Sequence, residues 1–265
     1  MENIKLLVFD IDGTLVDRSK QTVEESAKNA INKARDKGYE VLIATGRSFF
    51  FIHDDVKKSI NTDYYVTVNG ACLNDRKGEI IESYGFDKES LKTLIQYCKD
   101  NNYPLGVKYN KFIGVYGDFN KFVEDYVGSD HPQVDCLIAD VNEDFYLENE
   151  PLGVFYFAPR ETEEYISNLL PKLNFIPGDG PSMEAIRYDV DKTKNIEDVL
   201  KRLNLTWDNV MSFGDGNNDA KMLQLARIGV AMGNAEDEVK EHADYVTEHI
   251  LEDGIEEALK AFKII

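Results

Sequence analysis

The chain has 265 residues, which at roughly 150 residues per domain predicts one large domain or two modest ones. Its 43% hydrophobic content suffices for a proper core, so neither disulfides nor a metal is needed simply to fold. The 30 basic and 49 acidic side chains give a net charge of −19, which repels phosphate backbones and anionic membranes. Nucleic-acid and membrane partners are therefore not expected. A bound phosphate would need a local site that offsets this field, for which a divalent cation is the obvious means.

The cysteines and the start of the chain indicate a cytoplasmic protein. Cys72, Cys98 and Cys136 are odd in number, widely spaced and without a CxxC pair, as expected of reduced thiols. No stretch approaches the roughly 20 apolar residues of a membrane span. The first residues lack the long apolar region and cleavage site of a signal peptide. The acidic surface favours solubility and leaves open a monomer or a homodimer.

The first part of the chain alternates strands with helices. Residues 5–9 form an apolar run that ends at an aspartate, as in a strand buried on both faces. Thr22-Val23-Glu24-Glu25 predicts a capping box before a helix that Gly38 ends. A strand over 41–44, a helical stretch and a strand over 65–68 follow. This order predicts a parallel, Rossmann-like sheet with crossover helices.

A different pattern occupies the middle of the chain. It predicts helices and strands, dense in tyrosine and phenylalanine, over 88–101, 105–116, 118–127, 152–158, 161–173 and 183–187. The first pattern then returns, with strands over 210–213, 228–231 and 245–246 between helices. We therefore expect an α/β core formed by residues 1–82 and 187–265, interrupted by an antiparallel α+β domain over residues 83–186.

Polar residues follow strands of the expected core. These segments are Asp10-Ile11-Asp12-Gly13-Thr14, Thr45-Gly46-Arg47, the region around Lys192, and Gly214-Asp215-Gly216-Asn217-Asn218-Asp219. Ligands of open α/β sheets bind at the carboxyl ends of the strands. Each segment alone is more often a turn or a solvated loop, and only their combination predicts a magnesium site beside a phosphate site.

The chemistry of phosphate esters explains why these residue types would be combined. A carboxylate that attacks a phosphate monoester meets like-charge repulsion, which Mg²⁺ on carboxylate and phosphate oxygens cancels. The carboxylate then forms an acyl phosphate that water cleaves, while a second carboxyl group acts as general acid and then as general base. Asp10 and Asp12, two residues apart, can supply both roles. A lysine, a hydroxyl and backbone N–H groups would hold the transferring oxygens.

With these motifs the sequence resembles the haloacid dehalogenase superfamily, and within it the Cof-type phosphatases that carry an inserted α/β cap of the C2 type. The motifs are Asp10-Ile11-Asp12-Gly13-Thr14-Leu15-Val16, Ala44-Thr45-Gly46-Arg47, the Lys192 region and Gly214-Asp215-Gly216-Asn217-Asn218-Asp219. Asn69-Gly70-Ala71 is similar to the segment that leads into such a cap. The resemblance implies a phosphatase, and the middle domain would be the cap.

The resemblance also implies a role for each matching position. Asp10 would be the nucleophile and a ligand of Mg²⁺, and Asp12 the general acid and base, with its backbone carbonyl on the metal. Lys192 would neutralise the phosphoryl group. Thr45, Gly46 and Asn218 would bind the phosphoryl oxygens, and Asp215 and Asp219 would complete the metal site. Family members often have glycine after the lysine, whereas Thr193 follows Lys192, so Lys194 is the alternative lysine.

The expected function is Mg²⁺-dependent hydrolysis of a small phosphorylated metabolite, such as a sugar phosphate, through a phospho-aspartate. A sugar phosphomutase of the same superfamily would use the same residues. A non-enzymatic signalling protein that holds an aspartyl phosphate is the other alternative, although such proteins are shorter and lack a large insertion.

Overall fold

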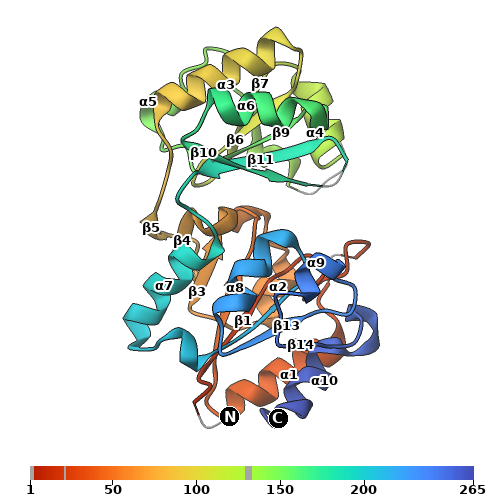
Figure 1. Cartoon of the computed structure of the whole chain (residues 1–265). Coiled ribbons are helices and arrows are strands. Elements are labelled where there is room, and N and C mark those ends of the chain that lie inside the picture. Colours follow the sequence, from red (N-terminus) through yellow and green to blue (C-terminus); the bar gives the residue numbers. More distant parts are fainter. Residues whose placement is uncertain (1–2, 21, 129–132, 179) are drawn as a thin grey trace. The chain divides into compact units, whose positions relative to one another are not determined.

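The computed structural model describes residues 3–20, 22–128, 133–178 and 180–265, which divide into two compact units (Figure 1). The core unit contains residues 1–47, 52–81 and 191–265. The inserted unit contains residues 48–51 and 82–190. Among the described residues, no helix has the length and apolar character that crossing a bilayer requires.

An eight-stranded sheet forms the centre of the core unit. In spatial order its strands are β14 (Tyr245–Val246), β13 (Ile228–Ala231), β12 (Val210–Gly214), β1 (Leu6–Phe9), β2 (Glu40–Ala44), β3 (Tyr64–Thr67), β4 (Cys72–Asp75) and β5 (Ile80–Ser83). The strands from β14 to β3 are parallel, and β4 pairs with β3 in the antiparallel direction. The predicted parallel, Rossmann-like core is therefore confirmed, with an antiparallel extension that the sequence pattern did not indicate.

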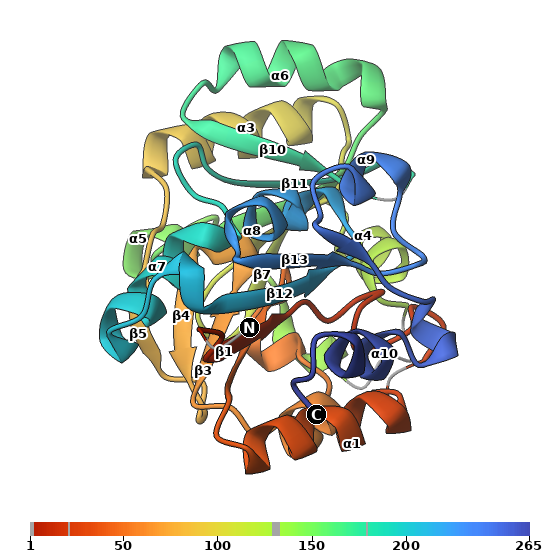
Figure 2. The ribbon, with the colours of Figure 1, turned by 60° about the horizontal axis from the view of Figure 1, so that its bottom comes forward.

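Helices cover both faces of this sheet (Figure 2). They are α1 (Glu25–Asp36), α2 (Asp54–Ser59), α7 (Lys192–Leu203), α8 (Ala220–Leu225), α9 (Asp237–Lys240) and α10 (Gly254–Ala261). Leu6 and Val8 of β1 pack with apolar residues of α7 and α8. Because side chains alternate along a strand, Leu7 and Phe9 face the other side, and both are buried. Burial on both faces explains the continuous apolar run of β1.

The inserted unit has a six-stranded sheet of its own. Its spatial order is β10 (Leu173–Pro177), β11 (Ser182–Arg187), β9 (Gly153–Phe157), β6 (Leu105–Lys108), β7 (Ile113–Tyr116) and β8 (Leu137–Ala139). The pairs are antiparallel except β7 with β8, which confirms the predicted α+β insertion. Its helices are α3 (Lys88–Asp100), α4 (Phe119–Tyr126), α5 (Phe145–Glu148) and α6 (Glu163–Leu169).

Two local expectations failed, each for a physical reason. The predicted capping box is wrong: Glu24 is the N-cap of α1 and makes no side-chain cap bond, and the Val23 N–H donates to Asp55 instead. The helix expected over 161–173 ends at Leu169, because Pro171 disfavours helical backbone before it, and β10 begins soon afterwards. Residues 48–51 pack with the inserted unit, since Phe51 lies among its apolar side chains.

Candidate functional site

Strand register sets the sequence-predicted acidic residues side by side in the core unit. Phe9 at the end of β1 lies opposite Phe213 of β12 and Ile43 of β2. The Asp10 N–H donates to the Phe213 carbonyl at 3.1 Å, which extends the ladder by one residue. Asp10 therefore begins its loop at the level where β12 ends and Asp215 follows.

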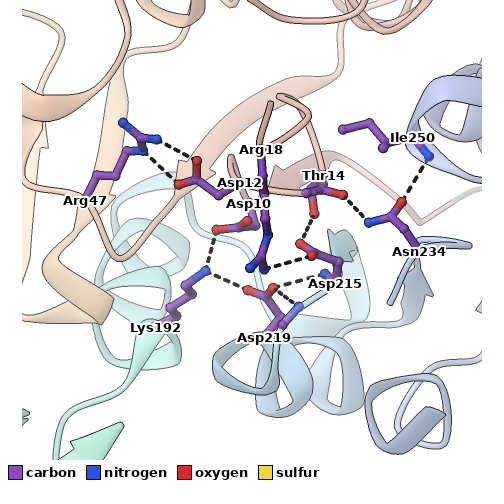
Figure 3. A network of polar contacts seen from close by, with 12 residues as sticks. Asp10, Asp12, Thr14, Arg18, Arg47, Lys192, Asp215, Asp219, Asn234 and Ile250 are labelled. Atoms are coloured by element: carbon purple, nitrogen blue, oxygen red, sulfur yellow. Dashed lines mark hydrogen bonds and ion pairs between the residues drawn. The ribbon is translucent and has the colours of Figure 1, made fainter. Parts of the chain in front are cut away.

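Three buried carboxylates meet at this edge of the sheet (Figure 3). Asp10, Asp215 and Asp219 each offer an oxygen, and these oxygens all lie within 4.8 Å of one another. The residues are only 5%, 6% and 1% exposed, so water screens their repulsion weakly. The cluster needs positive charge nearby to remain ionised.

Lys192 supplies part of that charge. It is the first residue of α7, and its ammonium group donates to Asp10 Oδ1 and Asp219 Oδ1, both at 2.6 Å. Burial by itself would lower the pKa of Lys192, but the Asp10 and Asp219 carboxylates raise it, so the lysine stays charged. Of the two lysines considered from the sequence, the fold brings Lys192 to the acidic cluster.

The other oxygen of Asp219 holds the loop after β12. Its Oδ2 accepts from the backbone N–H groups of Asp215 and Gly216 at 3.1 and 3.0 Å. One carboxylate thus orients both Lys192 and the backbone that carries Asp215.

Asp215 is held from the loop after β1. The Thr14 hydroxyl donates to its Oδ1 at 3.1 Å, and Arg18 Nη2 lies 3.4 Å from its Oδ2. Gly13 has a φ of 91°, and a Cβ at that position would overlap the Asp215 carboxylate. The glycine between Asp12 and Thr14 is therefore required for this close approach.

Asp12 points to a different partner. Arg47 donates to both of its carboxylate oxygens, from Nε to Oδ2 and from Nη2 to Oδ1, each at 2.7 Å. Although burial tends to raise the pKa of Asp12, the hydrogen bonds and charge of Arg47 lower it below its ordinary value. The Asp12 side chain is thus a carboxylate paired with Arg47, and it does not belong to the cluster formed by Asp10, Asp215 and Asp219.

The remaining predicted residues lie around the loop after β2. Thr45 is buried, and its hydroxyl oxygen accepts from the Arg47 N–H at 3.1 Å. Asn218 donates from Nδ2 to Oδ1 of Asn69 at 2.8 Å, and Asn69 itself lies against Gly46. Every sequence-predicted site residue thus belongs to the core unit.

The acidic cluster suits a divalent cation. Burial, together with the Asp219 charge, raises the pKa of Asp215 to about 6. Burial also raises the pKa of Asp10, with the neighbouring carboxylates adding to the effect of burial and Lys192 opposing it. Three carboxylates beside one ammonium group leave excess negative charge, and hard oxygen donors are what Mg²⁺ prefers. Asp10, Asp215 and Asp219 could therefore hold it.

Several residues of this network were not among the candidates that the sequence predicts. Thr14 lies in the motif that begins at Asp10, and Arg47 in the motif that begins at Ala44, so their place in these motifs could have indicated a role in the site. Nothing in the sequence pattern indicates a role for Arg18. Asn234, far along the chain, donates to the Gly13 carbonyl at 2.8 Å and accepts from the Ile250 N–H at 3.0 Å (Figure 3). Only the folded chain connects it to the loop after β1.

Comparisons with known proteins agree on the family. The model of the haloacid dehalogenase-like hydrolases matches residues 7–259. The 5-amino-6-(5-phospho-D-ribitylamino)uracil phosphatase YcsE of Bacillus subtilis is 29% identical over 97% of this chain and 95% of its own length. The phosphoglycolate phosphatase of Methanobrevibacter smithii is 27% identical over 98% of this chain and 99% of its own.

Solved structures lead to the same conclusion. The subclass IIB sugar phosphatase BT4131 is 31% identical, with a TM-score of 0.89 over 98% of this chain and 100% of that one. The phosphatase BT1666 from Bacteroides thetaiotaomicron is 26% identical, with a TM-score of 0.87 over 99% of this chain and 96% of that one. With its motifs, its fold and these relatives in agreement, the chain belongs to the haloacid dehalogenase superfamily and is a Cof-type phosphatase.

Proposed function

We propose that this phosphatase hydrolyses a small phosphorylated metabolite through a phospho-aspartate on Asp10, with Mg²⁺ as its cofactor. The observation that carries the proposal is the position of Asp10, whose buried carboxylate contacts Lys192 and has an oxygen within 4.8 Å of carboxylate oxygens of Asp215 and Asp219. A solvated loop or a structural turn would not need three buried acids around one buried lysine, because such charges are costly to desolvate.

In the first step, an Asp10 carboxylate oxygen attacks phosphorus and the bond from phosphorus to the leaving oxygen breaks. Asp12 gives its proton to that oxygen, so the product leaves as an alcohol and Asp10 carries an acyl phosphate. Arg47 holds Asp12 as a carboxylate in this structure, so proton delivery requires Asp12 to be protonated and its bonds with Arg47 to weaken.

In the second step, water attacks the phosphorus of the acyl phosphate. Asp12, now ionised, takes a proton from the water, and the bond between phosphorus and the Asp10 oxygen breaks to release inorganic phosphate. The Arg47 pair favours this base form of Asp12. Lys192, Thr45, Gly46 and Asn218 would hold the phosphoryl oxygens through both steps.

Asp10, Asp215, Asp219 and the Asp12 carbonyl would be the protein ligands of Mg²⁺. When bound, the cation supplies charge that offsets the repulsion between the Asp10 carboxylate and the phosphate dianion. Lys192 then needs to balance only part of the negative charge, and it can turn from carboxylates toward phosphoryl oxygens.

Relatives support a small substrate. The relatives include phosphatases named for a phosphorylated ribitylaminouracil, for phosphoglycolate and for sugar phosphates. We propose a sugar phosphate or a metabolite of similar size for this chain. The net charge of −19 agrees with a small substrate, since a large polyanion would be repelled.

The test is phosphate release from a panel of sugar phosphates, nucleotides and cofactor phosphates, with and without Mg²⁺. We expect release that requires the metal and falls by at least about 10⁴-fold in Asp10→Asn, because the amide cannot act as the nucleophile. Asp237→Asn, which changes a fully exposed aspartate at the start of α9, is the control and should keep wild-type activity.

Two results would contradict the proposal. Full activity of a folded Asp10→Asn protein would exclude Asp10 as the nucleophile. No release from any ester by a folded, Mg²⁺-binding wild type would favour the mutase if a bisphosphorylated sugar started turnover, or the signalling protein if a stable aspartyl phosphate accumulated.

A further inference from the structure

The turn over Val68–Gly70, which follows β3, has an unusual backbone, and none of its residues has a role in the proposed reaction. Its φ angles are 50° at Val68, 51° at Asn69 and 94° at Gly70. A β-branched residue such as valine rarely adopts a positive φ, because its side chain then crowds the backbone. Strained backbone of this kind persists only where surrounding contacts impose it, and it concentrates at functional sites.

The backbone of this turn is tied to the loop after β2. The Val68 N–H donates to the Arg47 carbonyl at 2.9 Å, and the Asn69 N–H donates to the Thr45 carbonyl at 3.1 Å. The turn therefore fixes the backbone on either side of Gly46, a residue proposed to bind phosphoryl oxygens.

The end of the turn is tied to the start of α7. The Gly70 carbonyl accepts from Nδ2 of Asn195, a fully buried residue, at 2.8 Å. A Cβ at Gly70 would overlap the backbone carbonyl of Asp191, the N-cap residue before Lys192. The turn thus packs directly against the backbone that positions the buried lysine.

The Asn69 side chain connects the third segment of the site. It is 2% exposed, and its Oδ1 accepts from Asn218 Nδ2 at 2.8 Å. A Cβ on Gly46 would lie 3.0 Å from the same oxygen, so Asn69 fits against the glycine backbone. Because an amide group is planar, committing one N–H of Asn218 to Asn69 also sets the direction of its second N–H.

We propose that Asn69 is a positioning residue that aligns the phosphoryl-binding groups of Gly46 and Asn218, and that the left-handed turn exists to bring it there. This inference rests on the proposed function, because it takes Thr45, Gly46 and Asn218 as the residues that bind phosphoryl oxygens. Asparagine suits the position because it tolerates left-handed backbone better than other side chains and carries an amide oxygen as acceptor.

The test separates the backbone from the side chain of Asn69. Asn69→Gly removes the amide but keeps access to a positive φ. Asn204→Gly is the matched control, since Asn204 has a φ of 55° at the exposed end of α7. The measured quantities are the Kd of inorganic phosphate by calorimetry with Mg²⁺ present, kcat and KM for the best substrate, and the Tm.

We expect Asn69→Gly to weaken phosphate binding about tenfold, because Asn218 loses the partner that orients it. Asn204→Gly should bind phosphate as the wild type does. Asn218→Ala should also weaken phosphate binding. In the double variant the Kd should rise by clearly less than the product of the two single fold-changes, since both substitutions disrupt the same coupled arrangement.

An Asn69→Gly protein with wild-type phosphate affinity and kcat would overturn the inference and leave the proposed function intact. Independent, multiplicative effects of Asn69→Gly and Asn218→Ala would also overturn it, because the residues would then not act together. A folded wild type that neither binds phosphate nor hydrolyses any ester would overturn the proposed function, and this inference with it.

Discussion

Asp215 is a buried carboxyl group whose surroundings disfavour its negative charge, and a bound cation would compensate for this. It is 6% exposed and lies beside Asp219, and burial is the main cause that raises its pKa to about 6. Thr14 and Arg18 offset this only in part. A carboxyl group with a raised pKa lowers the free energy of unfolding when it is ionised. In the metal-free protein this loss of stability is absent below about pH 4, the pKa of an aspartate in the unfolded chain, and it is complete above about pH 6. A divalent cation would remove this loss.

The affinity for Mg²⁺ should therefore depend on pH around this value. Because Asp215 must lose its proton before it can bind the metal, its contribution to the Kd should be constant well above pH 6 and should raise the Kd by up to about tenfold per unit below it. The raised pKa of Asp10 acts in the same direction.

Calorimetric titration of the metal-free protein with Mg²⁺ between pH 5 and pH 8 measures this dependence. Repeating it in buffers of different ionisation enthalpy should reveal proton release on binding near pH 6 and little at pH 8. The exposed-site variant Asp237→Asn should follow the wild-type curve. A Kd that stays constant from pH 5 to pH 8 would contradict the assignment of Asp215 as a ligand.

At the scale of elements, α3 shows how one side chain defines the start of a helix. Asp87 is its N-cap, and its carboxylate accepts from the Ser90 N–H and the Ser90 hydroxyl, both at 2.9 Å. Burial works in the opposite direction, but these bonds lower the pKa of Asp87 below its ordinary value. The ionised form thus stabilises the helix start, from which Leu91, Leu94 and Ile95 pack into the inserted unit.

Asp87→Ala should lower the free energy of unfolding of the inserted unit by about 1 kcal/mol at neutral pH, because a helix N–H loses its acceptor. Asp87→Asn, which keeps an acceptor, is the matched control and should retain most of the stability. Since the pKa is lowered on folding, the difference between wild type and Asp87→Ala should be full above the unfolded pKa near 4 and shrink as the pH falls through the folded value. Urea unfolding at pH 7 and pH 3 measures it, and equal stability at pH 7 would contradict the capping role.

At the scale of the whole molecule, the two units have separate interiors. Apolar residues of β1, β2 and α7 form one cluster in the core unit, whereas those of α3, β6 and β9 form another in the inserted unit. The acidic cluster belongs entirely to the core unit. Ligand binding stabilises only the structure that must be folded in order to bind.

Mg²⁺ should therefore protect the two units unequally. At a concentration of 100 times its Kd, bound metal stabilises its folded site by about 2.7 kcal/mol. Hydrogen exchange should slow for amides of β1 and β12 and change little for those of β6 and β9, because the inserted unit can open while the site stays formed. Exchange followed by mass spectrometry with Mg²⁺ or with chelator measures this. Equal protection in both units would mean that they unfold as one.

Sequence reasoning recovered the elements whose residues carry a local signal. The buried strands β1, β2 and β12 appear as short apolar runs that end in polar residues, and α3 and α7 as amphipathic repeats. The short elements β8 and α5 were not predicted, and neither were the strands β4 and β5. Their three or four residues are too few to show a period, and pairing with a neighbouring strand is what stabilises β4 and β8.

The same division holds for the site. By itself, the sequence determined the superfamily, the α/β core with its insertion, and the candidate residues, because acids, glycines and a lysine at strand ends form a local pattern that a linear chain displays. Only the tertiary structure decided that Lys192 meets Asp10, that Arg47 pairs with Asp12, and that Asn69 contacts Asn218. These contacts join segments distant in the chain, and their geometry follows from strand register, helix starts and one left-handed turn, which arise only when the sheet assembles.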